Sequence, residues 1–123
     1  GKARYAGTAV EEALPVVLLG NDDRVETPAG VHPHVIATDH PIVANLRAEM
    51  PALLGYNRVM TKPSAELVVG VGEDPLIAAG TFGRGRSVAF TSDCGPHWCP
   101  PPFVSWDGYA TMWHNLVRWA AGG

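Results

Sequence analysis

The chain has 123 residues, 46% of them hydrophobic and 17% charged, which suits one domain with a packed core and argues against a disordered chain. Its net charge of −3 and pI near 5.9 argue against a nucleic-acid partner, which needs a concentrated basic surface. No apolar run approaches the roughly 20 residues that span a bilayer, so no membrane partner is predicted.

The sequence predicts a cytoplasmic protein. The opening residues, GKARYAGTAVEE, lack the apolar stretch of a secretory signal. The chain has two cysteines, and without an export signal their expected state is the reduced thiol. Fourteen glycines and eleven prolines lie mostly between the predicted elements, which indicates many short strands joined by tight turns.

The chain begins with a predicted helix and a buried strand. The helix covers residues 8–14, with Thr8 as N-cap and Glu11 as its capping-box partner, and Pro15 ends it. The run VVLLG, residues 16–20, has four consecutive apolar side chains and predicts a buried strand.

Residues 21–35 are interpreted as turn-rich. A short strand is predicted over 35–37, followed by a helical turn over 41–46 with Asp39 as N-cap.

The middle of the chain predicts β-structure. Residues 66–72, 76–83 and 86–93 indicate a meander of three antiparallel strands, preceded by a loosely alternating stretch at 55–62. The period of two places Val88 and Phe90 on one face of the sheet.

The last element is an amphipathic helix from Tyr109, capped by Asp107 and ended by the glycines at 122 and 123. Its apolar residues repeat at the spacing of one helical face. The side chains expected to lie against the sheet are those of Tyr109, Met112, Trp113, Leu116 and Val117.

The stretch TSDCGPHWC, residues 91–99, allows several chemistries. Cys94, His97 and Cys99 could be zinc ligands, but a closed structural site needs a fourth ligand. The two cysteines could form a disulfide in an oxidising compartment. Cys94 could be a nucleophile with His97 as base, although the G-x-C-x-G pattern and an immediate helix are missing. The remaining interpretation is a scaffold corner packed over Trp98 and Trp106.

Two other stretches carry polar side chains. In FGRGRS, Arg84 and Arg86 could bind an anion, although hairpin turns often have this composition. His32, His34 and His40 are interpreted as solvated loop histidines, since their spacing suits no common metal geometry. Neither a metal nor a cofactor is predicted.

Several phrases, among them DDRVETPAGV, DPLIAAGTFGRGRSVAFTSDCGPHW and FVSWDGYATMWHNLVRWAAG, resemble the C-terminal half of a bacterial family of putative glutamine amidotransferases. This family is related to the class I glutamine amidotransferase and trehalose-utilisation-type folds. The resemblance implies a flavodoxin-like α/β/α three-layer sandwich of about twice this length, so residues 1–123 would be one domain portion whose N-terminal half is missing.

The resemblance also implies where catalytic residues belong. In amidotransferases of this fold a nucleophilic cysteine lies in the first half, and a histidine with an acidic partner follows a late strand. The positional counterparts here are Asp93 and His97, although D-C-G-P-H-W stands in place of H-P-E.

The leading hypothesis is an amidotransferase-like scaffold or small-ligand-binding module without a complete catalytic centre. Its ligand-facing residues would be Asp93, Cys94, His97 and Trp98, just past a core strand. The alternative is a hydrolase or amidotransferase that uses Cys94 and His97, and a third is a zinc-bound interaction module. Because half of the sandwich would leave sheet surface uncovered, self-association or pairing with another chain is predicted.

Overall fold

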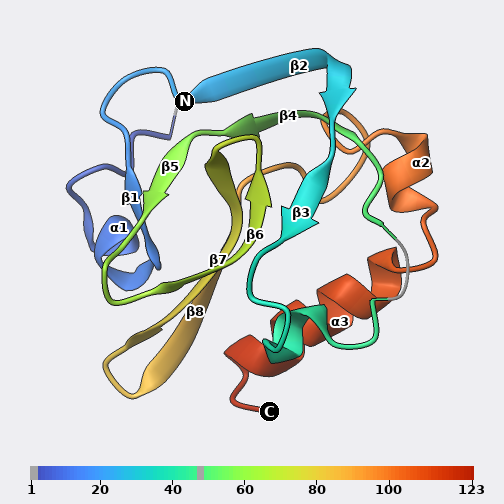
Figure 1. The fold of residues 1–123 in the computed structure, drawn as a ribbon. Helices are drawn as coiled ribbons and strands as arrows, with labels where there is room; N and C mark the ends of the chain where they lie inside the picture. The colour runs from blue at the N-terminus through green and yellow to red at the C-terminus, as the bar shows by residue number, and fades with distance from the viewer. Residues whose placement is uncertain (1–2, 47–48) are drawn as a thin grey trace.

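The structure is a computed structural model that describes residues 3–46 and 49–123 (Figure 1). The helical elements are α1 (Ala9–Ala13), the 3-10 helix η1 (Pro41–Val43), α2 (Pro101–Val104) and α3 (Tyr109–Ala120). The strands are β1 (Val16–Leu18), β2 (Arg24–Val31), β3 (Pro33–Val35), β4 (Leu53–Asn57), β5 (Val59–Thr61), β6 (Glu66–Val71), β7 (Asp74–Phe82) and β8 (Gly85–Phe90).

The centre of the fold is a four-stranded sheet with the order β3-β6-β7-β8. Two smaller pairs, β1-β5 and β2-β4, complete the strands of the described residues, and every pairing among them is antiparallel. The meander predicted from the sequence is confirmed as β6, β7 and β8. Phe82 pairs with Gly85, so the β7–β8 hairpin closes through a two-residue turn in which Gly83 has a φ of +57°.

Both faces of the central sheet are covered. On one face, η1 and α3 pack on the largest core cluster, in which Phe90 meets Trp113 edge-on at 5.0 Å. On the other face, Ala78 of β7 joins Val16 and Val59 from the β1-β5 pair in a second, smaller cluster. Because side chains alternate along a strand, β7 contributes to both clusters.

Helix α1 forms where predicted, but its capping box does not. Thr8 is the N-cap residue, and its hydroxyl donates to the carbonyl of Tyr5 instead of capping the helix. The Glu11 carboxylate accepts hydrogen bonds from the N–H groups of Leu18, at 2.7 Å, and Gly7, at 3.1 Å. These bonds lower the pKa of Glu11, with the Leu18 N–H as the largest cause. The carboxylate thus joins α1 to β1.

The interpretation of residues 21–35 as turns is wrong, because β2 and β3 lie there. β2 pairs with β4, and the register shifts between Glu26 and Val31, an irregularity that accommodates Pro28 and Gly30. β3 ends at Val35, so the strand predicted over 35–37 lies earlier in the chain.

The predictions for the following turn are also corrected. His40, and not Asp39, is the N-cap residue of η1, and the helical turn ends at Val43. His40 is also no solvated loop residue, because its side chain is only 7% exposed. His34 lies in β3, with its ring over Gly70.

Helix α3 confirms the C-terminal prediction, with Met112 and Leu116 buried. Its N-cap is Gly108 and not Asp107, and Val117 is 65% exposed instead of lying against the sheet. Helix α2 was not predicted from the sequence; it begins at two prolines that suit a first helical turn. Within residues 3–46 and 49–123, none of the helices has the length and apolar character needed to cross a membrane.

Candidate functional site

Residues 91–99, which we call the corner, connect β8 to α2 and bring Asp93 and His97 together. The Nδ1 atom of His97 lies 2.8 Å from Oδ2 of Asp93. An ionised carboxylate only accepts hydrogen bonds, so in the neutral imidazole Nδ1 carries the proton and Nε2 keeps its lone pair. The His97 side chain is 71% exposed, so this lone pair is open to a ligand.

The backbone at His97 is strained. Its φ is +143°, a region that residues with a Cβ rarely adopt. The Oδ2 atom of Asp93 also accepts a hydrogen bond from the backbone N–H of Trp98 at 3.0 Å. One carboxylate therefore holds both the imidazole of His97 and the chain that follows it.

The start of the corner is fixed to two neighbouring strands. The Thr91 N–H donates to the carbonyl of Leu76 at 3.0 Å, and its hydroxyl donates to the carbonyl of Pro75 at 2.9 Å. The Ser92 hydroxyl donates to the carbonyl of Gly55, in β4, at 2.8 Å. Asp93 therefore directly follows two residues that are held in place by hydrogen bonds, and a rigid backbone of this kind fixes the position of a polar side chain.

Trp98 forms the floor of the corner. Only 6% of the residue is exposed, and its indole N–H donates to Oε2 of Glu26, in β2, at 3.0 Å. The indole lies directly on Gly55, where an added Cβ would come within 2.3 Å of the ring nitrogen. The His97 ring stacks on Trp98 with centroids 5.6 Å apart. Glu26 and Gly55 were not predicted as neighbours of Trp98, because both are distant from it in the chain.

The two cysteines are free thiols in different environments. Cys94 is exposed, and its backbone carbonyl accepts a hydrogen bond from the Tyr109 hydroxyl. Cys99 is buried, and its S–H donates to the carbonyl of Asp93 at 2.7 Å. Burial raises the pKa of the Cys99 thiol. Among the described residues, no hydrogen bond joins either thiol to His97, and no group of three or more His, Cys, Asp or Glu side chains could hold a metal ion.

The two arginines of the predicted anion site are not part of the corner. Arg84 lies in the β7–β8 turn and Arg86 is the second residue of β8, whereas the corner follows the end of β8, about 17 Å from Arg86 at the rise of a strand. Arg86 donates to the carbonyl of Trp119 at 3.1 Å, and its guanidinium lies over the Trp119 ring, 5.0 Å from the centroid. Arg86 therefore holds the last turn of α3.

Comparisons with known proteins agree with this fold. The profile of the family described as "Putative glutamine amidotransferase" matches residues 1–122. The structure is similar to Cytoplasmic Protein STM3548 from Salmonella typhimurium, with 37% identity, a TM-score of 0.92, and coverage of 97% of this chain and 48% of that one. It is also similar to Cytoplasmic Protein STM1381 from Salmonella typhimurium LT2, with 40% identity, a TM-score of 0.91, and coverage of 96% and 48%.

The chain spans about half the length of these solved relatives. No curated protein sequence gives a significant match. The profile match covers almost all of the chain and confirms the resemblance found in the sequence, so the chain belongs to the putative glutamine amidotransferase family.

Proposed function

We propose that the chain contributes a histidine–carboxylate pair, His97 and Asp93, to a small-ligand site in an amidotransferase-like domain, and that it holds no complete catalytic centre of its own. The observation that carries the proposal is the 2.8 Å contact between Asp93 Oδ2 and His97 Nδ1 beside an exposed imidazole. A carboxylate that fixes the tautomer of an accessible histidine is the arrangement of a general base and its orienting acid.

The environments of the two cysteines support the proposal that the chain holds no complete catalytic centre. Glutamine hydrolysis requires a thiolate beside the base and donors for the oxyanion. Cys99 is buried, its S–H is engaged by a backbone carbonyl, and its pKa is raised by burial, which disfavours the thiolate. Cys94 is exposed and makes no described hydrogen bond to His97.

The proposal includes a larger assembly in the cytoplasm. The relatives are about twice as long and are described as cytoplasmic proteins. The flavodoxin-like three-layer sandwich that we propose for the whole domain needs parallel strands, whereas all strand pairs among the described residues are antiparallel. Large apolar side chains are exposed on the chain, at Met60, Phe82 and Val117 among others. A second copy or another polypeptide would bury them. Light scattering after size exclusion tests this, and a stable monomer at micromolar concentration contradicts it.

Two measurements test the proposed site. Nitrogen NMR of the imidazoles should show His97 protonated at Nδ1, and the Asp93→Asn variant should lose this preference. Asp107→Asn, an exposed carboxylate outside the corner, is the matched control and should leave His97 unchanged. L-glutamine incubated with the chain alone should release no ammonia above buffer. Ammonia release, or an Nε2-protonated His97 in the unmodified chain, contradicts the proposal.

A second candidate is an enzyme that uses Cys94 as nucleophile and His97 as base. It is favoured by the exposure of Cys94 and by its position three residues before His97. Iodoacetamide labelling across pH separates the two candidates. Labelling of Cys94 below pH 7 that is lost in a His97→Ala variant supports the enzyme, whereas labelling that rises only above about pH 8 rules it out.

A further inference from the structure

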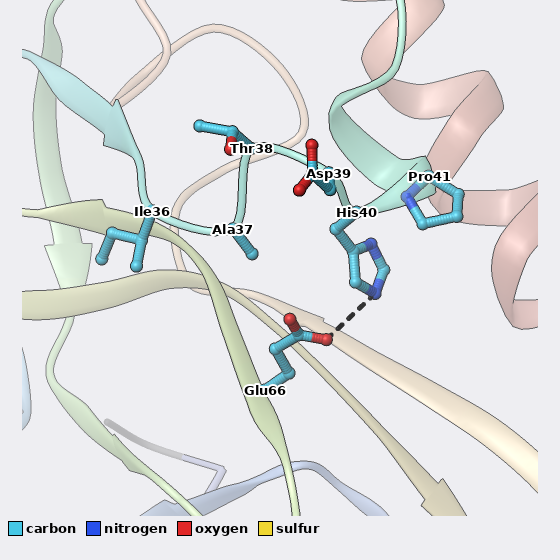
Figure 2. Close-up of a pocket in the computed structure, with 7 residues that line it drawn as sticks. All are labelled: Ile36, Ala37, Thr38, Asp39, His40, Pro41 and Glu66. Atoms are coloured by element: carbon cyan, nitrogen blue, oxygen red, sulfur yellow. Dashed lines mark ion pairs between the residues drawn. The ribbon is translucent and has the colours of Figure 1, made fainter.

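A second polar site lies on the central sheet, away from the corner. A pocket of about 440 Å³ lies between residues 36–41 and Glu66, the first residue of β6 (Figure 2). Glu66 pairs with Ala79, in the second half of β7, whereas the corner is hydrogen-bonded to Leu76, near the start of that strand. The residues that line the pocket all lie outside the corner, so this site is independent of the proposed histidine–carboxylate pair.

His40 lies in the wall of this pocket, and its contacts fix its tautomer. The Nδ1 atom accepts a hydrogen bond from the Ile42 N–H at 3.1 Å, so the proton of the neutral imidazole is on Nε2. Burial is the main cause that lowers the pKa of His40, Arg86 lowers it further, and Glu66 opposes both. The neutral form with the proton on Nε2 is therefore favoured at neutral pH.

The N–H at Nε2 is enclosed, but among the described residues it has no acceptor at hydrogen-bond distance. The His40 side chain is only 7% exposed, and its ring packs against Trp119 with centroids 5.3 Å apart. The Oε2 atom of Glu66 lies 3.7 Å from Nε2, beyond hydrogen-bond distance. Figure 2 shows the ring pointing toward this carboxylate. Because a buried N–H without an acceptor is unfavourable, a group that enters the pocket and accepts from Nε2 is stabilised there.

The gap between Nε2 and Oε2 selects the group that fits. At 3.7 Å it is too wide for a direct hydrogen bond, yet one oxygen atom can lie about 2.8 Å from both atoms. That oxygen must accept from His40 and donate to Glu66, and a hydroxyl does both. An ether or ketone oxygen only accepts, and an ammonium group only donates. Asp39, which also lines the pocket, adds a second carboxylate, and two carboxylates disfavour an anion.

The pocket has room for more than one hydroxyl group. Its volume of about 440 Å³ is far larger than the roughly 30 Å³ that one water molecule occupies in the liquid. Thr38 and Asp39 add two further polar side chains to the lining, so a ligand with several hydroxyl groups finds partners for more than one of them. We propose that this pocket binds an uncharged polyol, one hydroxyl group of which bridges His40 and Glu66.

Glycerol is the probe for the test, with the chain labelled for NMR. Glycerol should shift the His40 imidazole and the Ile42 amide in a saturable way. The dimethyl ether of ethylene glycol has as many non-hydrogen atoms as glycerol but only ether oxygens, and methylammonium has only donors. Each of these two compounds should bind at least about fivefold more weakly than glycerol, the cost of one lost hydrogen bond.

Variants place the effect at the pair. His40→Asn keeps an acceptor for the Ile42 N–H but loses the Nε2 donor, and Glu66→Ala removes the exposed acceptor. Each should weaken glycerol binding at least about fivefold. Glu73→Ala, the same charge change at an exposed residue beyond the other end of β6, should bind glycerol as the unmodified chain does. The proposal is overturned by an absence of saturable shifts, by equal binding of either comparison compound, or by a His40→Asn or Glu66→Ala variant that binds glycerol normally.

Discussion

The contact between Gly55 and Trp98 makes a prediction for Gly55→Ala. Gly55 has an ordinary extended backbone, so alanine is tolerated by the strand itself. The new methyl group, however, would lie 2.3 Å from the indole nitrogen and 2.6 Å from two ring carbons of Trp98. Real Cβ atoms do not approach this closely, so the indole must move, and its hydrogen bond to Glu26 must lengthen or break.

The expected cost has two parts. Forcing an extra methyl group into a packed site costs about 1–3 kcal/mol. Losing the bond to Glu26 costs about 1 kcal/mol, the value of an ordinary hydrogen bond, because Glu26 is exposed and water screens its charge. The free energy of unfolding should therefore fall by about 2–4 kcal/mol, which lowers the Tm by about 10 °C for a chain of this size.

Urea unfolding followed by far-ultraviolet circular dichroism measures this change. Gly20→Ala is the matched control, because an added Cβ there meets nothing within 4 Å. Its stability should change by less than about 0.5 kcal/mol. In a Trp98→Leu background, where the ring is absent, Gly55→Ala should cost less than about 0.5 kcal/mol, so the two changes should couple strongly.

Two results would refute this reasoning. One is a Gly55→Ala variant as stable as the unmodified chain, which means that the indole does not lie on the strand. The other is an equal cost of Gly55→Ala with and without Trp98, which means that the destabilisation comes from the backbone or from another neighbour.

Three further predictions concern single side chains. Burial, and then Arg86, lower the pKa of His40 in the folded chain, so the unfolded chain binds the proton more readily. The free energy of unfolding should therefore fall as the pH drops below about 6.5. The His40→Asn variant should lose this part of the pH dependence. The strained φ of His97 predicts that His97→Gly is more stable than His97→Ala by about 1 kcal/mol in urea unfolding, and the reverse order would count against the strain. In the folded chain iodoacetamide should label Cys94 and spare Cys99, as mass spectrometry of peptides would record; equal labelling would mean that Cys99 is not buried.

The sequence predicted those elements whose periodicity is strong. The spacing of apolar residues in α3 appears directly as a helix, and the apolar runs bounded by turn residues appear as β6, β7 and β8. β2 was missed because Pro28 and Gly30 interrupt its pattern, and its partner β4 lies more than twenty residues later. Val117 was wrongly predicted to lie against the sheet. The apolar face of α3 is wider than the part of it that the other described residues cover, and Val117 lies on the uncovered part.

The candidate site was predictable only in part. Asp93 and His97 lie four residues apart after a strand, so their proximity could be inferred from the sequence. Glu26 accepts a hydrogen bond from Trp98, which is 72 residues away in the sequence, and local sequence patterns do not predict contacts between residues so far apart. The side chain of His40 looked like a loop residue because histidine is an uncommon N-cap, and only the fold shows that it is enclosed by Trp119 and η1.

The Oδ2 atom of Asp93 has two roles in the corner: it fixes the backbone at Trp98, and it orients the imidazole of His97. The Trp98 N–H and the His97 imidazole bind the same atom but belong to different parts of the chain, one to the backbone and one to a side chain. If a ligand draws the imidazole away, the backbone bond remains, and the path of the loop into α2 is preserved. A rotation of the His97 side chain would therefore leave in place the hydrogen bond that fixes the loop.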